Sequence, residues 1–185
     1  MKLSYSSGEK HSTLIIKMLK SIKWLVLANV ILLGVSWAMS IVAYPRLPSE
    51  IPVHFNLSGL PDTWSEKSRF LFFIPPVIQA IFFIGFFILA RVSHLVYFPQ
   101  KDKISTLPSE KKRIIFDIIK EFIFLVLIFF NLIFIHFQRS VILTAHQLTP
   151  GMDIFYFYSI FGIIFLLVLL YFLRIKFKVR ELLNF

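Results

Sequence analysis

The chain has 185 residues, of which 57% are hydrophobic and only 16% are charged, and it contains no cysteine. A soluble domain keeps about a quarter of its residues charged, and one core of this size cannot remove so much apolar surface from water. The composition argues against a soluble globular enzyme, a disordered chain and a disulfide-stapled secreted domain. The net charge of +10 fits either nucleic-acid binding or a membrane protein, and its placement decides between them.

Four continuous apolar segments are each long enough to cross a bilayer core, which takes about 20 residues of helix. They cover residues 22–44, 70–90, 114–137 and 154–173. Because the apolar residues follow one another without strand-like alternation, helices are predicted and not barrel strands. The predicted fold class is all-α integral membrane, a four-transmembrane-helix bundle with a structured proline-rich extracytoplasmic loop.

The spans divide the chain into five parts. These are a basic cytoplasmic N-terminal segment (1–21), the first two transmembrane helices (22–92) with an outer loop (45–69), a basic cytoplasmic loop (93–113), the third and fourth transmembrane helices (114–173) and a basic cytoplasmic tail (174–185). Sixteen of the 20 Lys and Arg residues lie in or beside the three basic parts. Since basic residues near span ends stay cytoplasmic, both termini are predicted to be inside.

This distribution predicts a multi-pass protein of the bacterial inner (cell) membrane, with the lipid bilayer as partner and no nucleic acid. A second interpretation concerns the first span, because a basic start, an apolar stretch and Ile41-Val42-Ala43 also resemble a cleavable signal peptide. The apolar run is longer than a signal-peptide core, which favours a retained span.

Polar residues within the spans are predicted to form contacts between helices. These residues are Asn29, Ser36 and Ser40, on one face of the first span, with Gln79 and Asn131 as possible partners in the second and third spans. Counted along each apolar segment, Asn29 falls in the inner third, Gln79 near the middle and Asn131 in the outer third. One site that joins all three is therefore not expected.

Two further features fall at span ends. Pro75-Pro76 is expected to kink or restart the second helix near its outer end. Asp117, Lys120 and Glu121 share one helical face at the inner mouth of the third span, where Asp117 and Lys120 can pair. A solvated helix end is favoured there over a gate.

The outer loop departs abruptly from the spans that flank it. Four prolines stiffen it, namely Pro45, Pro48, Pro52 and Pro61. Residues 51–55 alternate like a short edge strand, and residues 56–59 form a turn signal that contains Asn and Gly. Pro61-Asp62 predicts a second turn, after which Ser65 or Ser68 is available to cap the next helix. A loop of this kind is expected to fold back over the outer mouth of the bundle.

The same loop carries a long motif made by Pro48, Ile51, Pro52, His54, Asn56, Gly59, Asp62, Trp64 and Lys67. This motif resembles the signature of the membrane family catalogued as domain of unknown function 1648. The resemblance covers the first two spans and the loop between them. It implies a relationship to toxin-immunity and signalling proteins of the SdpI type, which are similar in this part.

The candidate recognition residues are six members of that motif, His54, Asn56, Gly59, Asp62, Trp64 and Lys67. One hypothesis is an outer recognition surface for a peptide toxin or small-molecule ligand, with a cytoplasmic partner inside, which serves envelope protection or signal transduction. A second is a membrane metal-dependent enzyme that uses outer histidines and carboxylates. A third is a purely structural membrane subunit, in which the polar loop residues only hold the backbone.

The second outer connection adds further polar groups, namely His136, Arg139, His146, Gln147 and Asp153. No His-x-x-x-His or His-Glu-x-x-His spacing occurs in the chain, and no phosphate-binding glycine loop or nucleophile elbow is present. No catalytic residue, metal ligand set or cofactor is therefore predicted, and the chain is expected not to be an enzyme. The sequence leaves the oligomeric state open.

Overall fold

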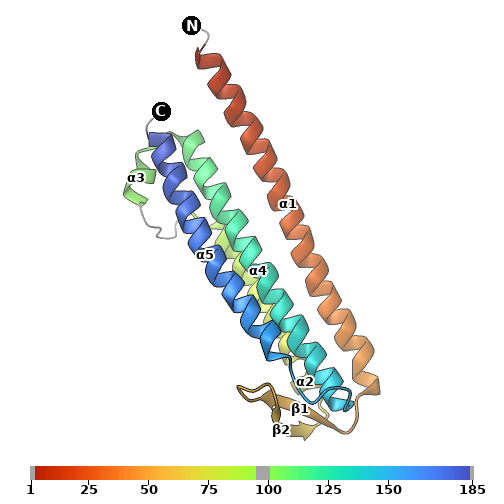
Figure 1. Cartoon of the computed structure of the whole chain (residues 1–185). Helices are drawn as coiled ribbons and strands as arrows, with labels where there is room; N and C mark the ends of the chain where they lie inside the picture. Colours follow the sequence, from red (N-terminus) through yellow and green to blue (C-terminus); the bar gives the residue numbers. More distant parts are fainter. Residues whose placement is uncertain (1–2, 95–100, 184–185) are drawn as a thin grey trace.

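The computed structural model describes residues 3–94 and 101–183. Its elements follow in the order α1 (Leu3–Ala43), the 3-10 helix η1 (Tyr44–Arg46), β1 (Glu50–Phe55), β2 (Pro61–Glu66), α2 (Arg69–Arg91), α3 (Lys101–Ser105), α4 (Ser109–Ala145) and α5 (Ile154–Leu183). Figure 1 shows α1, α2, α4 and α5 as long, nearly aligned helices, with the β1–β2 hairpin across one end and both chain ends at the other.

The four long helices each meet the length and hydropathy needed to cross a membrane. This confirms the four predicted spans and the all-α membrane fold. Each helix continues beyond its apolar segment, and α4 shows this most clearly because it extends from Ser109 to Ala145 instead of ending near Phe137. Its last turns carry the buried polar residues Gln138, Ser140 and Thr144, which hydropathy alone cannot assign to a span.

Helix α4 lies at the centre of the bundle and packs against α1, α2, α5 and β1. The core is therefore built around its apolar side chains. Ile115, Ile119 and Leu127 are buried with residues of α2, α5 and the inner connection. At the other end, Val141 and Ala145 are buried beneath the hairpin. The helix that touches every other span is the one with the largest buried surface, so it fixes the position of the rest.

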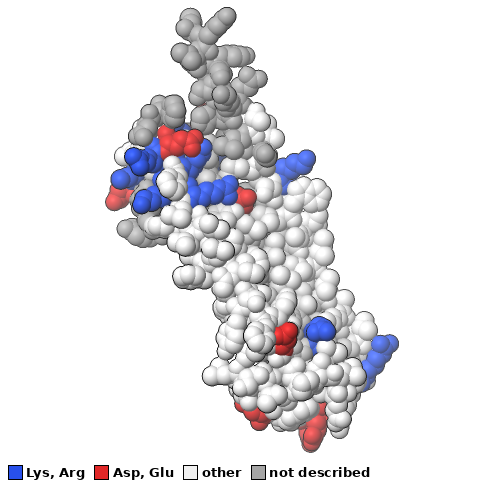
Figure 2. Space-filling model, viewed as in Figure 1, with Lys and Arg blue, Asp and Glu red and all other residues white. Residues whose placement is uncertain are grey.

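Charged side chains gather at the two ends of the molecule. Figure 2 shows a dense group of Lys and Arg at the end that holds the C-terminal part of α5, and a wide band without charged side chains on the face in view. The hairpin end carries acidic residues and a few basic ones. An uncharged band between two polar ends is the pattern expected of a protein that sits in a bilayer.

The first turns of α4 differ from the solvated helix end that the sequence predicts. Asp117 is almost completely buried and accepts a hydrogen bond of 3.2 Å from Lys120, which confirms the predicted pair, while Arg113 lies 3.9 Å from the same carboxylate. Glu121 accepts a hydrogen bond of 2.9 Å from Arg174 on α5. The prediction of a solvated end was wrong for Asp117, because neighbouring side chains cover this face of α4.

Candidate functional site

The outer loop folds into an antiparallel hairpin whose inner face is anchored in the bundle. Ile51 and Phe55 on β1 are buried against Phe72 of α2 and Val141 of α4, as expected for alternate residues of a half-buried strand. The predicted strand, the predicted first turn and the fold-back over the bundle are therefore confirmed. The second turn predicted at Pro61-Asp62 was wrong, since these residues begin β2.

Proline fits the first position of β2 because the missing N–H is tolerated at a strand start. Pairing with β1 then outweighs the local turn preference of Pro61-Asp62, and Phe55 lies opposite Pro61 in the ladder. Ser68 occupies the N-cap position of α2, but its side chain makes no capping hydrogen bond.

Asn56 and Gly59 build the tight turn between the strands. The Asn56 side-chain carbonyl accepts hydrogen bonds from the backbone N–H groups of Ser58, at 2.9 Å, and Leu60, at 3.1 Å. The backbone N–H of Gly59 donates to the backbone carbonyl oxygen of Asn56 at 2.9 Å, and Gly59 has a positive φ of 78°. These two motif residues therefore set the shape of the turn.

Gly59 also joins the hairpin to the connection between α4 and α5. Its carbonyl accepts a hydrogen bond of 2.7 Å from the backbone N–H of Met152. A Cβ atom on Gly59 would lie 2.3 Å from the Met152 carbonyl oxygen, and one on Gly151 would lie 2.2 Å from the Gly59 carbonyl oxygen. Only glycine allows the two backbones to approach this closely.

Lys67 closes the other end of the hairpin. Its ammonium group donates to the backbone carbonyl oxygens of Leu47, at 2.9 Å, and Pro45, at 3.4 Å. It also lies 5.2 Å from the centre of the Tyr44 ring, a distance typical of a cation–π contact. The Lys67 side chain thus ties the end of β2 to the segment that leaves α1.

His54 and Asp62 form a pair across the exposed face of the hairpin. The His54 Nδ1 atom lies 2.5 Å from an Asp62 carboxylate oxygen, and the two side chains are 65% and 40% exposed. The hydrogen bond from His54 lowers the pKa of Asp62 below its ordinary value of 3.8. Neither side chain is needed to fill the core, so the pair faces the surroundings of the hairpin.

Replacing His54 by glutamine is expected to raise the pKa of Asp62 back toward 3.8. Because the pKa of this carboxylate is lower in the folded chain, the pair stabilises the hairpin above the unfolded pKa, and this contribution is lost as the pH falls through the folded pKa. Carboxyl-carbon NMR titration of the wild-type and H54Q proteins measures the shift. An identical Asp62 pKa in both proteins would contradict the assigned cause.

Trp64 completes the same exposed face. It lies opposite Pro52 in the ladder and remains 43% exposed, although tryptophan is usually largely buried. Glu50 and Glu66 face each other two pairs further along, and both are exposed. The exposed side chains of the hairpin therefore include one aromatic ring and three carboxylates, whereas Ile51 and Phe55 of β1 are buried in the bundle.

The five polar residues of the spans lie buried inside the bundle, and three of them form one chain of hydrogen bonds. Gln79 donates to Asn131 at 2.8 Å, and Asn131 donates to Asn29 at 2.7 Å. The expectation that no site joins these three was wrong. Asn131 is in the outer third of its apolar segment, but α4 continues to Ala145, which places Asn131 closer to the middle of the helix.

Ser36 and Ser40 lie on the same helix as Asn29 but do not join this network. The Ser40 hydroxyl donates to the Ser36 carbonyl oxygen at 2.8 Å, one turn earlier on the same helix. Within the described residues, the Ser36 hydroxyl has no hydrogen-bond partner.

The polar residues of the second outer connection are spread over separate contacts. His136 is largely buried beside the Tyr156 ring, while the Asp153 side chain accepts hydrogen bonds from the backbone N–H groups of Phe155 and Tyr156 and so caps the start of α5. Gln147 has a positive φ of 57°. In residues 3–94 and 101–183, no three His, Asp or Glu side chains lie close enough together to share a metal ion.

Sequence inspection missed Gln138, which is buried on α4. Its side-chain N–H donates to the Phe72 carbonyl oxygen at 3.1 Å. In a regular helix this oxygen would accept from the residue four positions later, which is Pro76 and has no N–H. Gln138 therefore replaces the missing bond, and α2 continues through Pro75 and Pro76 without the predicted restart. The signal available in the sequence was Pro76, because a proline within a helix leaves the carbonyl oxygen four residues earlier without its donor.

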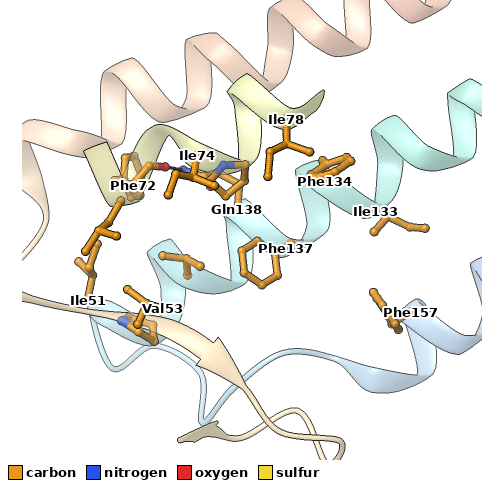
Figure 3. A pocket seen from close by; sticks show the side chains of 14 residues that line it. Ile51, Val53, Phe72, Ile74, Ile78, Ile133, Phe134, Phe137, Gln138 and Phe157 are labelled. Atoms are coloured by element: carbon orange, nitrogen blue, oxygen red, sulfur yellow. Dashed lines mark hydrogen bonds between the residues drawn. The ribbon is translucent and has the colours of Figure 1, made fainter. Parts of the chain in front are cut away.

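A cavity of about 350 Å³ lies beside Gln138, under β1 and between α2, α4 and α5. Figure 3 shows Ile74 and Ile78 on one side, Phe137 at the centre and Phe157 of α5 on the other. The lining is almost entirely apolar, and Gln138 is its one polar side chain.

Replacing Gln138 by leucine is expected to destabilise the protein by about 2 kcal/mol, because the Phe72 carbonyl oxygen loses its donor. In a P76A protein the alanine N–H donates to that oxygen instead. Q138L is therefore expected to cost less than about half as much stability in P76A as in the wild type. Thermal unfolding in detergent micelles of the four proteins of this cycle measures the coupling. Additive effects of the two replacements would contradict the role given to Gln138.

Comparison with known proteins gives one match. The model of the family described as Domain of unknown function (DUF1648) matches residues 31–79. The matched segment runs from the last third of α1 through the hairpin to the middle of α2, and is thus shorter than the sequence resemblance suggested. No curated protein and no solved structure matches the chain. The chain is therefore a four-helix, multi-pass membrane protein whose hairpin segment matches the DUF1648 family.

Proposed function

We propose that the hairpin is a recognition surface through which the protein protects the cell envelope against a peptide toxin or passes a signal inward. The observation that supports this most directly is the division of the six motif residues. Asn56, Gly59 and Lys67 hold the backbone of the hairpin. His54, Asp62 and Trp64 are exposed on one face, where they contribute little to the core. A rigid support that presents exposed side chains is the arrangement expected of a binding surface.

The chemistry of this face favours a peptide ligand with cationic and apolar groups. Trp64 offers an aromatic ring with a polar N–H, and the carboxylates of Glu50, Asp62 and Glu66 are exposed on the same hairpin. A cationic group gains from the carboxylates and from the face of the indole ring. The proposed role is binding without catalysis, and it places the hairpin outside and both termini in the cytoplasm of a bacterial cell, as the charge distribution favours.

The proposal is tested by toxin challenge of bacteria that express the protein. Cells with the wild-type chain are expected to survive a peptide toxin of the sporulation-delaying type, whereas W64A and the double variant H54Q/D62N lose protection at an unchanged protein level in the membrane. L57S is a matched control, because Leu57 lies in the turn, outside the proposed contact face, and its side chain is 87% exposed. Its protection is expected to equal that of the wild type.

The structural alternative makes a different prediction for the same experiment. If the hairpin serves only to hold the bundle together, W64A and H54Q/D62N lower protection only in proportion to the amount of folded protein. N56A provides the reference for this outcome, because it removes two hydrogen bonds within the turn. A parallel loss of protein in all these variants would refute the recognition role.

A further inference from the structure

A groove of about 720 Å³ runs along the surface between the hairpin-end halves of α1 and α4, which pack against each other in Figure 1. Its apolar lining consists of Val35, Ala38, Met39, Val42 and Ala43 from α1, and Ile142 and Leu143 from α4. These positions follow the three- and four-residue spacing of a single helix face. The groove is therefore formed by two helix faces that both point toward the surrounding membrane.

The groove also has basic lining residues. Arg46 from η1 and Arg139 and His146 from α4 line it together with the apolar residues. All three side chains are exposed, and within the described part of the chain neither arginine lies within ion-pair distance of a carboxylate. The carboxylates of the hairpin face and Asp153 do not line the groove. A guanidinium group near apolar surface is stabilised when an anion accompanies it.

The position of these arginines is unusual for the chain. Only four of its 20 basic residues lie at the hairpin end, namely Arg46, Lys67, Arg69 and Arg139. Lys67 is already bound to backbone carbonyl oxygens. Of the remaining three, the two that line this groove come from helices that are far apart in the sequence. Basic residues are disfavoured on the outer side of membrane proteins, so their convergence on one apolar groove calls for a specific anion.

We propose that the groove binds an anionic phospholipid, with its phosphate held by Arg46 and Arg139 and one acyl chain along the apolar lining. Guanidinium groups match phosphate oxygens in charge and geometry. From Val35 to Arg46 the helix rises by about 16 Å, which is close to half of a hydrocarbon core of about 30 Å. Arg46 thus lies at headgroup depth when the α1 lining spans one leaflet, and Arg139 reaches the same groove from α4.

The test uses the full chain in detergent micelles and measures the shift of thermal unfolding on titration with phosphatidylglycerol, phosphatidylcholine or inorganic phosphate. The wild type is expected to prefer phosphatidylglycerol, and R46Q and R139Q are each expected to weaken its apparent affinity by about fivefold. The double variant R46Q/R139Q is expected to lose the preference over phosphatidylcholine. R69Q removes the same charge outside the groove and is expected to keep it.

Two further arms separate this site from general charge attraction. A38W fills the apolar lining without a change in charge and is expected to abolish the preference, and V42W gives the same test if A38W does not fold. Equal weakening in R69Q, a retained preference in R46Q/R139Q, or no effect of filling the groove would each overturn the proposal. A stabilisation by inorganic phosphate as large as that by phosphatidylglycerol would also overturn it, since the acyl chain would then contribute nothing.

Discussion

Replacing Gly59 by alanine is expected to destabilise the protein by about 3 kcal/mol. Two costs add at this position, namely backbone strain at a positive φ and a steric clash of the added Cβ. The residue has a φ of 78°, and the added Cβ would lie 2.3 Å from the backbone carbonyl oxygen of Met152. A backbone atom cannot move aside as the end of a flexible side chain can. Thermal unfolding of purified protein in detergent micelles measures the loss.

Gly34 provides the matched control for this replacement. It lies within α1, and apart from the backbone of its own helix no described atom lies within 4 Å of a Cβ built on it. G34A is therefore expected to be neutral or to stabilise the protein by up to about 1 kcal/mol, because alanine favours the helix. Equal stability of G59A and the wild type would mean that the turn does not pack on Met152 as described.

The second large effect is expected at Asn131, which joins α1, α2 and α4 through its side chain. Leucine at this position removes the acceptor of Gln79 and the donor to Asn29, and both partners stay buried in an apolar environment. The expected loss of stability is about 2 kcal/mol, because two buried polar groups lose a partner and each unpaired group costs energy. This exceeds the net contribution of an average transmembrane hydrogen bond, which is about 0.6 kcal/mol. Unfolding in mixed micelles with increasing denaturing detergent measures it.

Ser36 is the control for Asn131, because its buried hydroxyl has no partner in the described part of the chain. S36A is expected to leave stability nearly unchanged. A loss in S36A as large as that in N131L would show that any polar replacement on these faces is costly, and the network would then have no special role.

The sequence was sufficient to predict the four spans, since a helix in lipid needs a long apolar run and little else. It was not sufficient to predict where they end. In the last turns of α4, Gln138, Ser140 and Thr144 are polar but buried. Gln138 lies against α2, and Thr144 lies against Thr149 in the connection to α5. Hydropathy measures transfer to lipid and contains no information on cover by another part of the same chain.

Only the first strand of the hairpin could be predicted, for a similar reason. The alternation of residues 51–55 is a local signal, and β1 follows it. Strand β2 contains Pro61, Asp62 and two serine or threonine hydroxyls, which favour a turn when considered alone. Its extended form depends on pairing with β1, and the division of the motif into supporting and exposed residues depends on the resulting register.

The contact between Gly59 and Met152 also sets an order for assembly. The first two spans and the hairpin leave the ribosome well before the connection that begins α5. Until that connection arrives, the turn lacks its backbone partner, and Ile51 and Phe55 lack the Val141 and Ala145 surface on which they are buried. The hairpin therefore gains its remaining anchors only when the last two spans have been inserted.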